Sequence, residues 1–212
     1  MAGAISSDLE SKGIEARVAA RVLASMGSEV KNQILYNIAE KLESEQKGIL
    51  EANVQDMESG RREGLSEAVL DRLLLDGDRL AGMATGIRAV AVLPDPVGEE
   101  LGARTMSNGL VVSRRSVPIG VVGVIYESRP NVTVDIAALC LKSGNACILR
   151  GGSEALNSNL ALTKLISCAV KSAGGPQGSI QFLDDLDRSL VLQMLQMREY
   201  IDLMIPRGGA EL

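Results

Sequence analysis

Apolar positions in the first hundred residues recur at helical spacing. One face of the segment 28–44 carries Val30, Ile34, Leu35, Ile38, Ala39 and Leu42, and the other carries Lys31, Asn32, Glu40 and Lys41. This period of 3.6 residues predicts an amphipathic helix, for which Ser28 is a plausible N-cap. Similar spacing predicts that residues 5–58 are mostly helical.

Two further helices are predicted in the segment 60–93. Asp76-Gly77-Asp78 separates them, and Pro94 and Pro96 end the second. Proline disfavours helical geometry in the residue before it, so the helical part should stop here.

The pattern changes after Pro96. Two strand-like runs flank Ser107-Asn108-Gly109, and Asn-Gly between such runs is a strong signal for a tight hairpin turn. We therefore predict a β-hairpin over residues 101–117.

From residue 118 onward, short apolar runs alternate with helical segments. The expected strands are 119–127, 145–150, 178–183 and 200–205, and the expected helices are 131–144, 158–175 and 187–197. A continuous apolar run suits a strand that is covered on both faces. This alternation predicts an α/β fold with a parallel, Rossmann-like sheet, right-handed crossovers and helices on both faces.

Composition narrows the classes of function. The 212-residue chain has a net charge of −5, which argues against a dedicated nucleic-acid binder. The apolar runs are too short for a membrane span, and residues 1–13 lack the pattern of a signal peptide, so we expect a cytoplasmic protein without membrane contact. The sequence has no histidine, which removes Ser-His-Asp and Cys-His catalysis. Without histidine a zinc site is disfavoured, and no metal is expected.

Three cysteines, Cys140, Cys147 and Cys168, lie in apolar segments. Free cysteine in such surroundings behaves as a small core residue. All three are predicted to be buried and inert.

Ligands of parallel sheets bind in the loops beyond the carboxyl ends of the strands. Three loops qualify: "ESRPN" (127–131), "RGGSE" (150–154) and "PRGGAEL" (206–212). Each contains an arginine, and two contain paired glycines. None matches the G-x-G-x-x-G pattern of dinucleotide-binding loops.

Arg150 is the strongest candidate for ligand binding. Its guanidinium, followed by Gly151, Gly152 and Ser153, can bind a phosphate group, and a helix that begins near Glu154 would add its amide donors. The alternatives are structural. Arg150 can extend into solvent at a strand end, and Glu154 can complement the helix dipole. Arg129-Pro130-Asn131 can be a helix entry with Asn131 as the N-cap.

The segment "SVPIGVVGVIYESRPNVTVDIAALCLKSGNACILRGGSEALNSN" resembles the signature region of the gamma-glutamyl phosphate reductase family, within the aldehyde dehydrogenase superfamily. "YIDLMIPRGGAEL" and "LDRLLLDGDRLAGMATGIRAVAVLPDPVG" resemble two further blocks, so the resemblance covers essentially the whole chain. It implies NADPH-dependent reduction of L-glutamyl 5-phosphate to glutamate 5-semialdehyde and phosphate, in proline biosynthesis. The resemblance also implies that the chain has three parts: a helical part (1–100), a hairpin for oligomerisation (101–117) and a Rossmann-like NADP-binding part (118–212). A homo-oligomer is expected for the full-length protein.

The resemblance also suggests roles for single residues. Aldehyde dehydrogenases carry a Lys-x-x-Glu pattern that binds the adenosine ribose; Arg150 stands where that lysine would be, and Ser153 and Glu154 lie close to the acid. Arginine there suits a 2′-phosphate, which favours NADP(H) over NAD(H). The expected cofactor-binding residues are Arg150, Gly151, Gly152, Ser153, Glu154, Arg207, Gly208 and Gly209. Arg129 is a candidate for substrate binding, and Asn131 for stabilising the oxyanion.

One part of the family pattern is missing. The superfamily uses a cysteine nucleophile that lies beyond the "PRGG" block, in a second domain. We therefore expect this chain to be the cofactor-binding part, with the catalytic domain and its cysteine absent. Two alternatives stay open. One is a non-catalytic nucleotide-binding or dimerisation module. The other is a general NAD(P)-dependent aldehyde dehydrogenase, which is disfavoured because "ESRPN" replaces the Trp-Asn-Phe-Pro block of those enzymes.

Overall fold

The computed structural model describes residues 5–208 of the chain. Five helices come first: α1 (Ser7–Ala24), α2 (Ser28–Ser44), α3 (Gln46–Arg62), α4 (Glu67–Leu73) and α5 (Gly77–Val92). They are followed by β1 (Glu100–Thr105), β2 (Val111–Arg115), β3 (Val121–Tyr126), α6 (Pro130–Lys142), β4 (Ala146–Arg150), the short 3₁₀ helix η1 (Ser153–Ala155) and α7 (Leu156–Ser172). The last elements are β5 (Ile180–Phe182), α8 (Ser189–Gln196) and β6 (Leu203–Arg207). The predicted alternation of strands and helices is confirmed.

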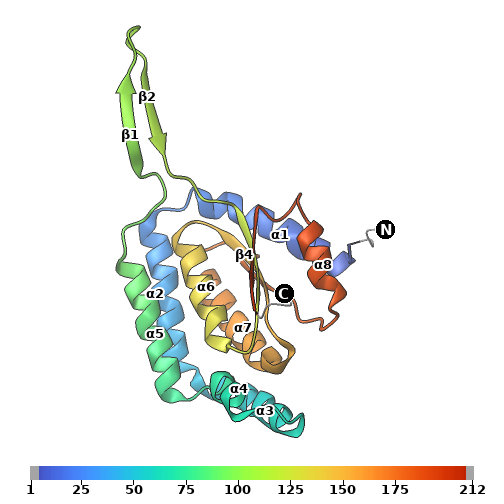
Figure 1. Ribbon diagram of the computed structural model, residues 1–212. Helices are drawn as coiled ribbons and strands as arrows, with labels where there is room; N and C mark the ends of the chain where they lie inside the picture. The colour runs from blue at the N-terminus through green and yellow to red at the C-terminus, as the bar shows by residue number, and fades with distance from the viewer. Residues whose placement is uncertain (1–4, 209–212) are drawn as a thin grey trace.

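Four parallel strands form the central sheet, in the order β5-β4-β3-β6. Helices α6 and α7 cover one face, with α2, α3 and α5 packed outside them, while α1 and α8 lie on the other face (Figure 1). Every residue of β3 is buried, as the continuous apolar run predicts. The predicted α/β fold with a parallel sheet covered on both faces is confirmed.

The hairpin of β1 and β2 extends away from the body of the molecule (Figure 1). Gly109 has a φ of +85°, which is the conformation that makes glycine the preferred residue in this turn. Every residue of both strands is exposed. The hairpin predicted from Asn108-Gly109 is therefore present, and its apolar side chains face solvent in this chain.

One of the predicted caps is wrong. Gly27 precedes α2, and Ser28 is the first residue of that helix. The Ser28 hydroxyl instead donates to Asp95 Oδ2 at 2.6 Å, because Asp95 follows α5 and lies beside the start of α2. Asp76 caps α5 by accepting from the Arg79 amide at 2.8 Å, which agrees with the predicted break in the helical part.

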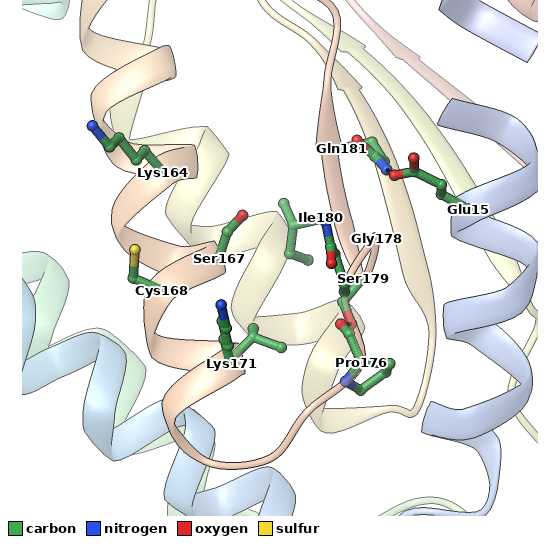
Figure 2. Close-up of a pocket in the computed structure, with 12 residues that line it drawn as sticks. Glu15, Lys164, Ser167, Cys168, Lys171, Pro176, Gly178, Ser179, Ile180 and Gln181 are labelled. Atoms are coloured by element: carbon green, nitrogen blue, oxygen red, sulfur yellow. Dashed lines mark hydrogen bonds between the residues drawn. The ribbon is translucent and has the colours of Figure 1, made fainter. Parts of the chain in front are cut away.

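The prediction for the cysteines holds at two positions and fails at the third. Cys140 and Cys147 are buried, but Cys168 is exposed. Cys168 lies on α7 between Lys164 and Lys171, at a hollow of about 310 Å³ beside the edge strand β5 (Figure 2). The apolar pattern of 158–175 predicted the helix but not that Cys168 falls on its outer side.

Cys168 should therefore be the only thiol of the three that reacts quickly in the folded protein. The Cys140 sulfur and burial together raise the pKa of Cys147, which further suppresses its reactive thiolate form. Titration with an aromatic disulfide reagent should show one fast thiol, and two more only after denaturation. A fast phase that survives in Cys168→Ser would contradict this assignment.

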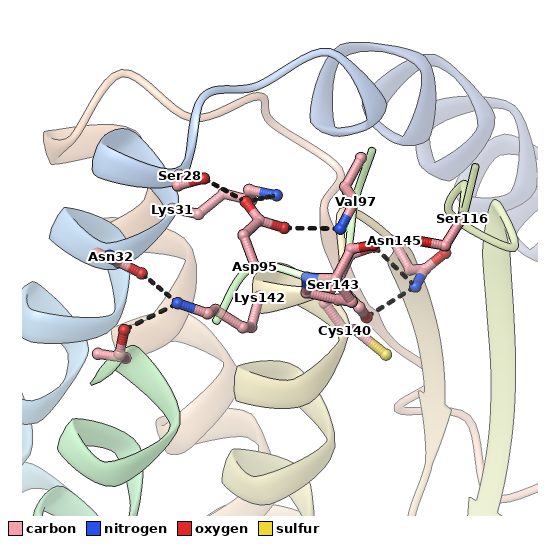
Figure 3. Close-up of polar contacts among 12 residues, drawn as sticks. Ser28, Lys31, Asn32, Asp95, Val97, Ser116, Cys140, Lys142, Ser143 and Asn145 are labelled. Carbon is pink, nitrogen blue, oxygen red and sulfur yellow. Dashed lines mark hydrogen bonds and ion pairs between the residues drawn. The ribbon is translucent and has the colours of Figure 1, made fainter. Parts of the chain in front are cut away.

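A buried ion pair holds the segment that leads to the hairpin. Lys31 Nζ is fully buried and lies 2.5 Å from Asp95 Oδ2 (Figure 3). Asp95 also accepts from Ser28 and from the Val97 amide. Nearby, Lys142 Nζ at the end of α6 donates to Asn32 Oδ1 at 2.6 Å and to the Ala91 carbonyl at 2.8 Å. These contacts join α2, α5 and α6 at the base of the hairpin.

We predict that Asp95→Asn lowers the free energy of unfolding by about 3–5 kcal/mol, because it leaves the buried Lys31 ammonium without a counter-charge. Burial alone would raise the pKa of Asp95, but its contacts with Lys31, Ser28 and Val97 outweigh burial and lower the pKa. The stabilisation is therefore present above the ordinary carboxyl pKa and is lost as pH falls through the lowered value.

Denaturant unfolding at several pH values measures this difference. The matched control is Glu43→Gln, which breaks the exposed pair between Glu43 and Arg88 and should change stability little. Equal losses in the two variants would show that the buried pair has no special role.

Candidate functional site

The three arginine-containing loops lie at one edge of the sheet. Residues 127–131 follow β3, Arg150 ends β4 and is followed by residues 151–154, and Arg207 ends β6 and is followed by Gly208. Because β4, β3 and β6 are neighbours and run parallel, their carboxyl ends lie side by side. This is the edge at which ligands of such sheets bind.

The register of the strands places the side chains of Arg150 and Arg207 on opposite faces of the sheet. In parallel strands, paired residues point to the same face, and successive residues alternate. Arg150 pairs with Ile125, whereas Arg207 pairs with Tyr126. The Tyr126 hydroxyl lies 2.5 Å from Thr133 of α6, so Arg207 is on the α6 and α7 side, and Arg150 is on the α1 and α8 side. The sheet edge therefore offers two separate cationic positions.

Arg150 is held against the loop that joins β5 to α8. Its Nη2 donates to the carbonyls of Leu186 and Asp187, both at 3.3 Å. Its Nε is buried and has no partner among the residues that the structure describes. Burial lowers the pKa of Arg150, against the opposing effect of nearby Asp185 and Asp187. The two carbonyls thus orient Arg150, while its Nε donor has no partner among the described residues.

The Gly-Gly turn after Arg150 is tightly packed. A Cβ on Gly152 would collide with the Glu154 carboxylate, and a Cβ on Gly151 would collide with Asn159 Nδ2. Glu154 Oε1 accepts from both the amide and the hydroxyl of Ser128, at 2.7 and 2.6 Å. Ser128 has a φ of +35°, a strained value for a residue with a side chain. Glu154 therefore links the loops after β3 and β4.

The prediction that the helix after Arg150 offers free amides is wrong for its first turn. A single 3₁₀ turn precedes α7, which begins at Leu156. The amides of Asn157 and Ser158 donate to the two carboxylate oxygens of Asp56, a buried residue of α3, at 3.1 and 2.7 Å. Asp56 also accepts from both side chains, at 2.8 and 2.6 Å. These donors are satisfied within the protein and are not available to a phosphate.

A second hollow, of about 300 Å³, lies on the other side of the sheet edge. Its lining is Arg72, Glu127, Ser128, Arg129, Arg207 and Gly208. The predicted residues Arg129, Arg207 and Gly208 thus come together, apart from Arg150. Arg72 comes from α4, where no sequence motif marks it as part of the site. Gly209, also expected to bind the cofactor, lies outside the described residues.

Asn131 is not an N-cap. Arg129 occupies the capping position, Pro130 is the first residue of α6, and Asn131 is the second. This agrees with the preference for proline at a helix start. Asn131 Nδ2 donates to Asp135 Oδ2 at 3.1 Å, and both residues line a neighbouring hollow that Arg72 also borders. Burial raises the pKa of Asp135, with Asn131 and Arg207 acting in the opposite direction.

The described residues contain neither a cluster of metal ligands nor a membrane-spanning helix. Within residues 5–208 we find no cluster of three or more acidic or cysteine side chains that could hold a metal ion. No helix in this part of the chain has the length and apolarity needed to cross a bilayer.

Comparison with known proteins gives consistent names. No family model matches the chain. It is 54% identical to gamma-glutamyl phosphate reductase of Moorella thermoacetica over 205 residues. The aligned region covers 97% of this chain and 49% of that protein. The crystal structure of gamma-glutamyl phosphate reductase from Thermotoga maritima has a TM-score of 0.95 at 46% identity, covering 97% of this chain and 50% of that one. The chain spans about half the length of these relatives.

More distant structures share the fold. Solved aldehyde dehydrogenases give TM-scores of 0.68–0.73 at 15–17% identity, over 93–96% of this chain and 42–43% of theirs. An engineered glycolyl-CoA reductase with bound NADP⁺ gives 0.67 at 16% identity, over 95% of this chain and 42% of its own. Along nearly its whole length, the chain is therefore similar to about half of a gamma-glutamyl phosphate reductase, and it shares its fold with solved aldehyde dehydrogenases.

Proposed function

We propose that the chain forms the cofactor-binding part of a reductase that uses NADPH to convert L-glutamyl 5-phosphate into L-glutamate 5-semialdehyde and phosphate, in proline biosynthesis. The similarity to gamma-glutamyl phosphate reductases supports the reaction. The observation that carries the cofactor assignment is Arg150. It lies at the carboxyl end of β4, next to the turn of Gly151 and Gly152, and its buried Nε has no partner among the described residues.

These residues fit a dinucleotide with a 2′-phosphate. Bound NADPH would supply the hydride. Arg150 would hold the 2′-phosphate by a charge-assisted hydrogen bond, with the Ser153 hydroxyl beside it. Gly152 is partly exposed and has no side chain that would keep a ribose away from its backbone. Glu154 Oε1 fixes the turn through Ser128, which leaves Glu154 Oε2 as an acceptor for a ribose hydroxyl.

Asn131, the cysteines and the hairpin bear on the reaction and on the assembly of the enzyme. Asn131 would stabilise a developing oxyanion with its amide, once that amide leaves Asp135. The three cysteines lie outside the lining of the hollow beside Arg129, so we propose that the thiol nucleophile comes from elsewhere in the enzyme. The hairpin supports a homo-oligomer, because it exposes Leu101, Met106, Leu110, Val111 and Val112. We propose that the enzyme works in the cytoplasm.

Arg150→Ala should weaken NADPH binding by about 1.5–3 kcal/mol, the usual contribution of a hydrogen bond to a charged group. NADH binding should change far less, because NADH has no 2′-phosphate. Calorimetric titration of both cofactors into wild-type and variant protein measures the two losses.

Two further variants make this test specific. Arg150→Lys keeps the charge but not the forked geometry, and should give an intermediate loss. Arg198→Ala removes an exposed arginine at the opposite end of β6 and should affect neither cofactor. Equal losses of NADPH and NADH affinity in Arg150→Ala, with an unchanged melting temperature, would remove Arg150 from the phosphate site.

A further inference from the structure

Three arginines from separate parts of the chain line the hollow beside β6. Arg72 comes from α4, Arg129 from the N-cap of α6 and Arg207 from the last position of β6. All three side chains are exposed. None of them forms a hydrogen bond or a salt bridge with the part of the chain that the structure describes. By contrast, Arg17, Arg79 and Arg88 each pair with a carboxylate.

The positive charge of this hollow favours the binding of an anion. Among the described residues, its lining contains three guanidiniums and one carboxylate, that of Glu127, which gives these residues a net charge of plus two. Like charges gathered around a concave surface repel one another and raise the local potential. A ligand with two negative charges would balance the hollow, whereas a single carboxylate would leave it positive.

We infer that the hollow formed by Arg72, Arg129 and Arg207 binds the phosphoryl group of an acyl phosphate. The charge balance and the forked donors of arginine point to a phosphate dianion. The identification of that phosphate as the substrate's leaving group rests on the proposed function. Arg207 and Gly208, which the sequence predicts to bind the cofactor, then bind the substrate together with Arg72.

This site is separate from the proposed position of the 2′-phosphate. Arg150 and Arg207 end strands that are two positions apart in the sheet, which places their backbones about 10 Å apart. Their side chains also leave on opposite faces, as the pairing with Ile125 and Tyr126 requires. One phosphate group cannot contact both guanidiniums, so the two positions can be tested independently.

The test is binding of small anions to the chain, without turnover. Inorganic phosphate, acetyl phosphate and acetate are titrated by calorimetry at low ionic strength into wild-type protein, Arg72→Gln and Arg198→Gln. Wild type should bind phosphate and acetyl phosphate more tightly than acetate. Arg72→Gln should weaken the binding of both phosphates by about tenfold to a hundredfold, as expected for a lost charged hydrogen bond. Arg198→Gln, which removes the same charge far from the hollow, should leave it unchanged.

NADPH affinity and thermal stability separate the outcomes. Arg72→Gln should keep the wild-type melting temperature and NADPH affinity, and Arg150→Ala should keep its affinity for acetyl phosphate. Wild-type protein that binds neither phosphate, or binds acetate equally well, would overturn the inference while leaving the cofactor assignment intact. A loss of NADPH affinity in Arg72→Gln as large as its loss of phosphate affinity would assign the hollow to the cofactor and would also overturn it. If NADPH does not bind but acetyl phosphate does, the proposed function fails and the phosphate site remains.

Discussion

Side-chain alternation along the buried strand β3 determines the layout of the site. All six residues of β3 are buried, so the strand is fixed between two helical layers and cannot rotate its side chains to the other face. Ile125 and Tyr126 at its end therefore face opposite sides, and so do the residues paired with them, Arg150 and Arg207. A shift of β6 by one residue would place both arginines on the same side. The register of three strands thus separates two cationic positions that look equivalent in the sequence.

Buried polar side chains outside the sheet hold the loops at this edge in place. Asp56 of α3 satisfies the first amides of α7 and their side chains, and so anchors the helix that follows Arg150. Asn53, one turn earlier on α3, donates to the Leu73 carbonyl and accepts from the Leu75 amide, which fixes the end of α4 and hence Arg72. Helix α3 therefore supports both cationic positions. Removing either polar group would leave buried donors without partners, at a cost of about 1–3 kcal/mol each.

Local patterns were enough to predict most of the fold. The apolar run of β3, the Asn-Gly turn of the hairpin and the prolines after α5 each act through neighbouring residues, so each could be recognised without tertiary information. The N-cap expected at Ser28 failed because Asp95, 67 residues away, binds its hydroxyl. The burial expected for Cys168 failed because its helix covers the sheet with a different face. These errors come from contacts that are distant in the sequence.

The site was predictable only in part, for the same reason. Strand-end loops with arginine and glycine pointed to the correct edge, but Asp56 resembles any solvated acid on a helix, and Arg72 lies in a helix without a recognisable motif. The loop of Leu186 and Asp187 offers Arg150 only backbone carbonyls, which no sequence pattern marks. Strand pairing could have revealed the separation of Arg150 and Arg207, but the register of β6 against β3 was not available from the sequence.

The separation of the two cationic positions can be measured directly by amide NMR of the chain titrated with NADP⁺ and, separately, with NAD⁺. The two cofactors differ only in the 2′-phosphate, so the difference between their chemical-shift changes reports the position of that phosphate. We predict differences confined to residues 150–154 and to the loop 183–188 that Arg150 contacts. Differences concentrated instead at residues 127–131 and 207–208 would show that the 2′-phosphate lies in the hollow of Arg72, Arg129 and Arg207, and would contradict the assignment of Arg150.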